Sequence, residues 1–146
     1  MQARVRPLAA HQLATATLCA VGLYETDGSR AEFEKHQAER LSELVKRFDT
    51  GSDQYQPSIP LALYLANSEE FDQLIGAGGL LERMTAIGDD ALAVRLAFET
   101  VLSREPDADE LATIQSFLSA RVDRAAAAKR QMIWSLLTSS EFRFSH

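Results

Sequence analysis

Apolar residues recur along most of this chain at the three- and four-residue spacing of an amphipathic helix. In the stretch after residue 28 the apolar stripe falls at Phe33, Leu41, Leu44, Val45 and Phe48. Such a stripe places one face of a helix against a core and leaves the charged residues on the other face. No stretch shows the strict alternation of a half-buried strand. The pattern therefore predicts an all-α fold.

Turn-forming residues separate these apolar runs and divide the chain into helices of ordinary length. We expect an irregular bundle of about seven or eight helices in a single domain that spans residues 1–146. The segment 49–57 has turn formers and no apolar periodicity, so it is expected to be a flexible loop within that domain. The expected helices lie near 7–22, 29–48, 58–66, 67–75, 80–87, 89–104, 107–122 and 125–137.

One local pattern recurs at the corners between helices. A polar cap is followed three residues later by an acid, and often by Phe behind the acid, which is the sequence signature of a capping box. Residues 63–71 and 134–142 repeat this pattern so closely that either convergent capping or an old duplication explains them. The pattern occurs at Ser29/Glu32/Phe33, Asn67/Glu70/Phe71 and Thr138/Glu141/Phe142, and without Phe at Asp107/Glu110.

The segment 104–107 is the polar cluster with the most distinctive setting. Arg104 is expected in the last turn of a helix, which Pro106 ends. We expect Arg104 to bind helix-end carbonyls or Glu141 and so to lock the corner. If that ion pair is buried, loss of one partner costs roughly 3–5 kcal/mol. In the alternative interpretation this cluster is a site for an anion or a carboxylate on a partner, with Arg104 as the cation. Glu105, Asp107 and Glu141 are then further possible partner contacts.

Composition and charge narrow the functional classes. The net charge is −6, with 21 acidic and 15 basic side chains, which disfavours binding to nucleic acid. The acidity is concentrated after residue 60, where 8 basic residues face 13 acidic ones. No stretch approaches the ~20 apolar residues of a membrane span. The one cysteine, Cys19, excludes an intrachain disulfide and is expected to be a buried, inert thiol.

Other candidate chemistry has a simpler structural explanation. Glu32, His36, Glu39 and Glu43 share part of one helix face, but no other helix offers a matching ligand set, so a solvated face is favoured over a metal site. The glycines at 76, 78 and 79 lack the strand–turn–helix setting of a phosphate loop and are expected to serve as left-handed helix caps. We expect no catalytic residues, no metal and no cofactor.

Several short motifs together resemble a known family. The chain is similar, over nearly its whole length, to a domain of unknown function found in planctomycetes and their relatives, family 1553 of such domains. Ser103 departs from the glycine usual in that family, and Ala9 departs from a polar cap. The matching motifs are Arg6-Pro7-Leu8 with Gln12-Leu13, the segment 60–68, Leu102-Ser103-Arg104-Glu105-Pro106 with Glu110-Leu111, Trp134-Ser135-Leu136-Leu137, and the ending 140–146.

The resemblance implies context rather than chemistry. Its members are C-terminal domains of large exported proteins that often carry a cytochrome-c-like domain, which implies a periplasmic or exported location. This chain has no Cys-x-x-Cys-His for covalent haem. Residues 97–144 also resemble, more weakly, a second helical domain of secreted and surface bacterial proteins.

We therefore expect a non-catalytic module that contacts other domains or a protein partner. The alternative is an accessory part of a redox or hydrolytic enzyme assembly, with a polar cleft near Arg104 or the segment 49–57.

Overall fold

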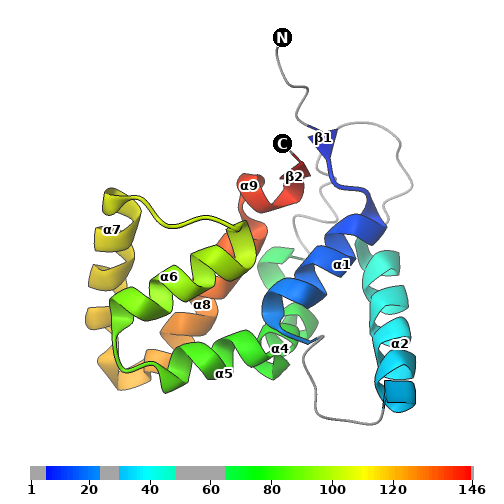
Figure 1. Ribbon diagram of the computed structural model, residues 1–146, viewed down its shortest axis with the longest axis horizontal. Helices are drawn as coiled ribbons and strands as arrows, with labels where there is room; N and C mark the ends of the chain where they lie inside the picture. The colour runs from blue at the N-terminus through cyan, green and yellow to red at the C-terminus, as the bar shows by residue number, and fades with distance from the viewer. Residues whose placement is uncertain (1–5, 24–29, 49–64, 146) are drawn as a thin grey trace.

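The computed structural model describes residues 6–23, 30–48 and 65–145, which are almost wholly helical (Figure 1). The all-α prediction is confirmed, with eight α-helices and one 3-10 turn bounded within these ranges and residues 65–67 also helical. The expected loop at 49–57 and the capping box that begins at Ser29 lie outside the described residues. The elements are α1 (Ala10–Val21), α2 (Arg30–Phe48), α4 (Glu69–Ala77), α5 (Gly79–Ala86), α6 (Asp90–Leu102), α7 (Ala108–Ser119), η1 (Val122–Arg124), α8 (Ala125–Thr138) and α9 (Ser140–Arg143).

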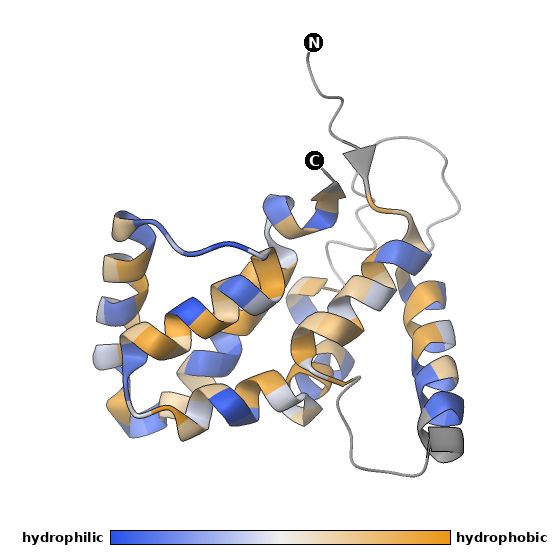
Figure 2. Cartoon of the chain, viewed as in Figure 1, coloured by the Kyte–Doolittle hydropathy of each residue, from blue (hydrophilic) through white to orange (hydrophobic). Residues whose placement is uncertain are grey.

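The helices form a bundle around α8, with a hairpin of α1 and α2 packed against it (Figure 1). Helix α8 contacts α4, α5, α6, α7 and α9, while α1 contacts α2 on one side and α5 and α6 on the other. One contiguous hydrophobic core runs through both parts. Apolar positions gather where helices face each other and polar positions face outward (Figure 2), as the helical spacing predicts.

Helix α1 is covered on more than one side, as its breadth of apolar residues indicates. Leu13, Leu18 and Val21 are buried, and Ala14 is fully enclosed. The prediction of a buried Cys19 is wrong, because the thiol lies on the exposed face of the helix. Partial desolvation by the surrounding chain still raises the pKa of this thiol.

Two glycines allow a close backbone crossing between α1 and the α4–α5 corner. Gly22 has φ 81° and ends α1 in the left-handed conformation that glycine tolerates best. Gly78 has φ −81°, so the expectation of a left-handed cap at this position is wrong. Its requirement is spatial instead, since a Cβ at Gly78 would lie 1.9 Å from the Val21 carbonyl oxygen.

A two-residue antiparallel pairing brings the ends of the described chain together. Strand β1 (Arg6–Pro7) pairs with β2 (Phe144–Ser145), and the Leu8 amide donates to the Arg143 carbonyl at 3.0 Å (Figure 1). The hydrophobic pattern contains no sign of this pairing, because a strand of two residues is too short for alternation to be visible.

Candidate functional site

The corner after α6 is built by a residue in an unusual backbone conformation. Helix α6 ends at Leu102, and Ser103 turns the chain with φ 55°. Arg104 therefore lies beyond the helix, and the prediction that it occupies the last helical turn is wrong. The reason is that Ser103 adopts the left-handed conformation, so the guanidinium of Arg104 swings away from the axis of α6 toward α7 and α9.

Arg104 joins three elements through a fully bonded guanidinium. Its Nε and one terminal nitrogen donate to the two carboxylate oxygens of Glu141 at 2.6 and 2.8 Å. Its terminal nitrogens donate to both oxygens of Glu110 at 2.9 Å each, and one also donates to the Glu105 carbonyl at 3.0 Å. A guanidinium has five N–H donors. The expected contact with Glu141 is present, and no donor remains for an external anion.

The electrostatics of this cluster follow from the two charge-assisted pairs. Hydrogen bonds from Arg104, and then from the Asp107 amide, lower the pKa of Glu110 to about 2. The pKa of Arg104 is raised, first by Glu141 and next by Glu110. The Arg104 side chain remains 37% exposed, so the ion pair is not the buried one considered from the sequence. Its free energy is therefore smaller than that of a buried pair.

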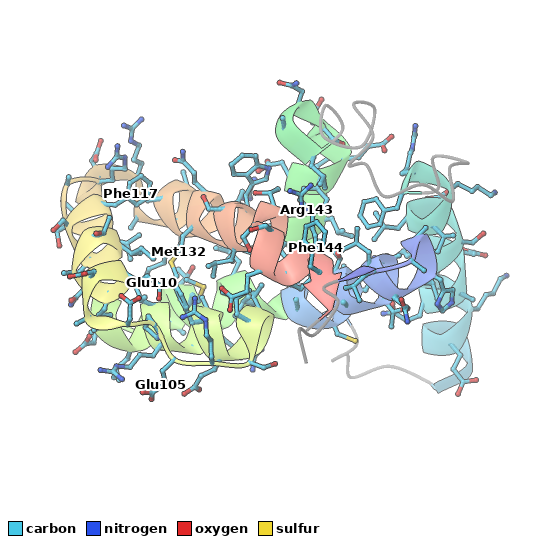
Figure 3. All side chains as sticks on the ribbon, turned by 90° about the horizontal axis from the view of Figure 1, so that it is seen from above. Glu105, Glu110, Phe117, Met132, Arg143 and Phe144 are labelled. Carbon is cyan, nitrogen blue, oxygen red and sulfur yellow. The ribbon has the colours of Figure 1, made fainter. Side chains whose placement is uncertain are left out.

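The other two predicted corner residues serve local structure. Asp107 caps α7 by accepting from the Glu110 amide at 2.8 Å, while Glu110 accepts from the Asp107 amide at 2.9 Å. The side chain of Glu105 turns outward and pairs with Arg95 at 3.4 Å, and Figure 3 shows it at the outer edge of the molecule. Glu110 was not predicted as a partner of Arg104. Its place in the first turn of α7 was visible in the capping box.

In the two similar segments 63–71 and 134–142, the residue that caps the following helix lies one position later than predicted. Ser68 accepts from the Phe71 amide at 3.1 Å, and Ser139 accepts from the Phe142 amide at 3.2 Å. The expected caps at Asn67 and Thr138 were therefore wrong by one position, because Ser is as good a cap as its neighbours. Glu70 and Glu141, which were predicted to complete capping boxes, bind arginines instead. Glu70 accepts from Arg47 at 3.0 Å.

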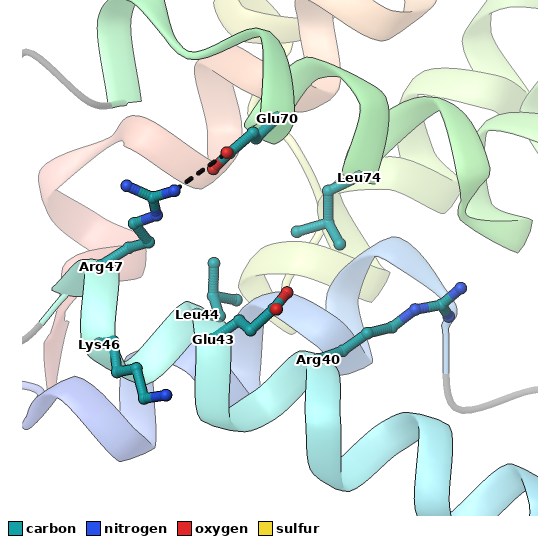
Figure 4. A pocket seen from close by; sticks show the side chains of 7 residues that line it. All are labelled: Arg40, Glu43, Leu44, Lys46, Arg47, Glu70 and Leu74. Atoms are coloured by element: carbon teal, nitrogen blue, oxygen red, sulfur yellow. Dashed lines mark hydrogen bonds and ion pairs between the residues drawn. The ribbon is translucent and has the colours of Figure 1, made fainter.

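A groove of about 620 Å³ lies between α2 and α4 (Figure 4). Leu74 points from α4 toward the side chains of α2, and the pair of Arg47 and Glu70 closes one end. This groove could not be predicted from the sequence, since 20 residues separate the two helices in the chain. It is lined by Arg40, Glu43, Leu44, Lys46, Arg47, Glu70 and Leu74.

The remaining candidate groups form no further cluster. In the ranges 6–23, 30–48 and 65–145, no three His, Cys, Asp or Glu side chains come together as metal ligands. His36 lies 3.8 Å from Glu39 on an exposed part of α2. No described helix is long and apolar enough to cross a membrane. The buried Lys129 donates to the Met84 carbonyl at 3.0 Å and so satisfies the end of α5.

Comparison of the chain with protein-family models, with curated proteins and with solved structures found no match. The family resemblance described from the sequence motifs therefore stays a prediction. What is known of this molecule's chemistry rests on its own residues, above all the corner around Arg104 and the groove between α2 and α4.

Proposed function

We propose that this chain is a non-catalytic helical module through which a larger exported protein packs its domains or recruits a partner chain. The groove between α2 and α4 supports this proposal, because it combines apolar walls with a charged rim, as protein interfaces do. The larger exported parent comes from the family resemblance alone.

Two other features of the molecule do not support an interaction role. The breadth of apolar residues on α1 is used within the molecule, where α2, α5 and α6 cover it. All five N–H donors of the Arg104 guanidinium form hydrogen bonds with groups of the same chain. The groove is thus the surface on which the proposal rests.

A photo-crosslinking experiment in cells of the source organism tests the proposal. A benzophenone-bearing amino acid is placed at Glu43, on the rim of the groove, and in a matched variant at the exposed Thr113 on α7. We expect a protein adduct of discrete mass from position 43 and none from position 113. Equal adducts from both positions, or none from position 43, would contradict the proposal.

The second candidate function is an accessory role in a redox or hydrolytic enzyme assembly. It is favoured by one observation, which is that Arg40, Glu43 and Lys46 give the groove a polar lining close to the end of α2. In that case these groups complete a site on another domain. Glu43→Gln and Arg40→Gln would then abolish turnover by the intact parent while its assembly is retained. Loss of assembly together with turnover favours the interaction module instead.

A further inference from the structure

The helix starts at Ser68 and Ser139 have the same local arrangement but differ in the number of carboxylates that bind their arginine. In each, a serine caps a short helix, a glutamate follows two residues later, and a buried phenylalanine follows the glutamate. In each, an arginine from a distant element donates to that glutamate. Arg47 of α2 binds Glu70, and Arg104 binds Glu141.

Arg104 and Arg47 differ in whether a second carboxylate of the described chain binds them. Arg104 also holds Glu110, the third residue of α7, with two bonds of 2.9 Å. Arg47 makes one bond, from a terminal nitrogen to Glu70, and no other side-chain bond of Arg47 occurs within the described ranges. Of the five N–H donors of Arg47, one is used by a side chain of the described residues, the one that binds Glu70 at the end of the groove.

The walls and charges of the groove indicate what would complete it. Leu74 offers apolar surface in the groove, and the buried Leu44 lies on the facing helix α2. Arg40 and Lys46 on the same rim have no ion-pair partner in the part of the chain that the structure describes, although the whole chain carries a net charge of −6. Three cationic side chains against two glutamates in the lining, on a protein that is acidic as a whole, favour a carboxylate-bearing partner. Glu43 and Glu70 in the same lining disfavour a polyanion such as nucleic acid.

We propose that the α2–α4 groove binds a helix of a partner protein whose first turn carries a carboxylate. That carboxylate takes on Arg47 the place that Glu110 takes on Arg104, and an apolar residue of the next turn packs on Leu74. The internal template for this occupant is α7, where Glu110 meets the arginine and the adjoining Leu111 packs on the core. The proposal rests on the proposed interaction function and names the chemistry of the partner.

A titration followed by NMR tests the proposal on the full chain. The probe is a synthetic peptide of residues 105–120, which reproduces the template helix with its acidic first turn. We expect saturable shifts of backbone amides confined to the groove segments 40–47 and 70–74, with a dissociation constant of about 1 mM or tighter. Arg47→Ala in the protein, or Glu110→Gln in the peptide, should weaken binding at least about tenfold.

The matched control is Arg124→Ala, which removes an exposed arginine from η1, far from the groove in sequence. Arg47 is 57% exposed, so its removal is expected to leave the fold intact, which the NMR spectrum of the variant itself checks. Shifts outside the groove, or binding that Arg47→Ala leaves unchanged, overturn the proposal. So does an absence of saturable shifts.

Sedimentation of the chain alone separates a partner protein from a second copy. A dimer that dissociates on Arg47→Ala would assign the groove to a second copy and overturn the assignment to a partner protein. If the peptide fails while position 43 still yields its crosslinked adduct, the partner chemistry is wrong and the interaction function stands. If both fail, the interaction function is also wrong.

Discussion

At the scale of the residue, Arg104 shows how one side chain can close a corner that the backbone leaves open. Ser103 turns the chain out of α6, and the guanidinium then holds α7 through Glu110 and α9 through Glu141. The ring of Phe98 lies 5.3 Å below the guanidinium and supports it from the helix side. The cluster is therefore a clamp between three elements, and its energetic effect is open to measurement.

Arg104→Ala should lower the free energy of unfolding by about 1–2 kcal/mol. This is less than the roughly 3–5 kcal/mol for a fully buried pair, because water screens a side chain that is 37% exposed. Chemical denaturation monitored by circular dichroism measures the change. The matched control is Arg95→Ala, whose exposed pair with Glu105 at 3.4 Å should contribute less than about 0.5 kcal/mol. Equal effects of the two substitutions would contradict the clamp.

Glu110 should make stability depend on pH in the acid range. Its pKa is about 2 in the folded chain and in the ordinary glutamate range, about 4.3, when unfolded. The unfolded chain therefore binds more protons between these values, so the stabilisation is complete above about pH 5 and is lost as the pH falls toward 2. Glu110→Gln should be less stable than wild type at pH 7 by about 1 kcal/mol, a value discounted for solvent screening.

Thermal unfolding at a series of pH values provides the measurement for Glu110. The difference between wild type and Glu110→Gln should shrink as the pH falls from 5 to about 2, because protonation neutralises the wild-type carboxylate. A difference that is constant with pH would mean that the charge of Glu110 does not stabilise the fold.

At the scale of the element, the short helices are positioned by their caps and by close contacts between backbones. Ser68, Asp89, Asp107 and Ser139 each accept a backbone N–H at the start of a helix. At the other end of α1, the chain passes so close to the α4–α5 corner that only a glycine fits at position 78. The packing of the α1–α2 hairpin on the bundle thus requires a residue without a Cβ at position 78.

Gly78→Ala should destabilise the protein by roughly 2–4 kcal/mol, because the new methyl group would overlap the Val21 carbonyl oxygen. The matched control is Gly88→Ala, where a Cβ has no atom within 4 Å and the expected change is within about 0.5 kcal/mol. Thermal unfolding of both variants tests the prediction. Wild-type stability of Gly78→Ala would mean that α1 and the α4–α5 corner can separate without cost.

The elements themselves were largely predictable, because helical periodicity and caps are local signals. The capping box at Asp107 and Glu110 is present as predicted, and Asp89 caps α6. Contacts between distant segments were not predictable in the same way. The contact of Arg104 with Glu141 could be proposed because both residues mark corners, whereas Arg47 stands in a run of ordinary surface charges.

At the scale of the whole molecule, a hairpin of α1 and α2 packs on a bundle centred on α8, and both share one core. Most large apolar side chains are used in that core, and Leu92 and Val122 are the exposed large ones among the described residues. The groove between the hairpin and α4 is therefore formed by tertiary packing, and neither helix alone contains it. This is why the interaction surface could not be located from the sequence.

Trp134 has a consequence for how this molecule can be observed. It is the sole tryptophan of the chain, and its indole N–H donates to the Leu65 carbonyl at 2.7 Å, which joins α8 to the backbone just before α4. Indole emission depends on polarity and hydrogen bonding around the ring. Its fluorescence is thus a built-in optical reporter of one junction, and it can be compared with circular dichroism, which averages over every helix.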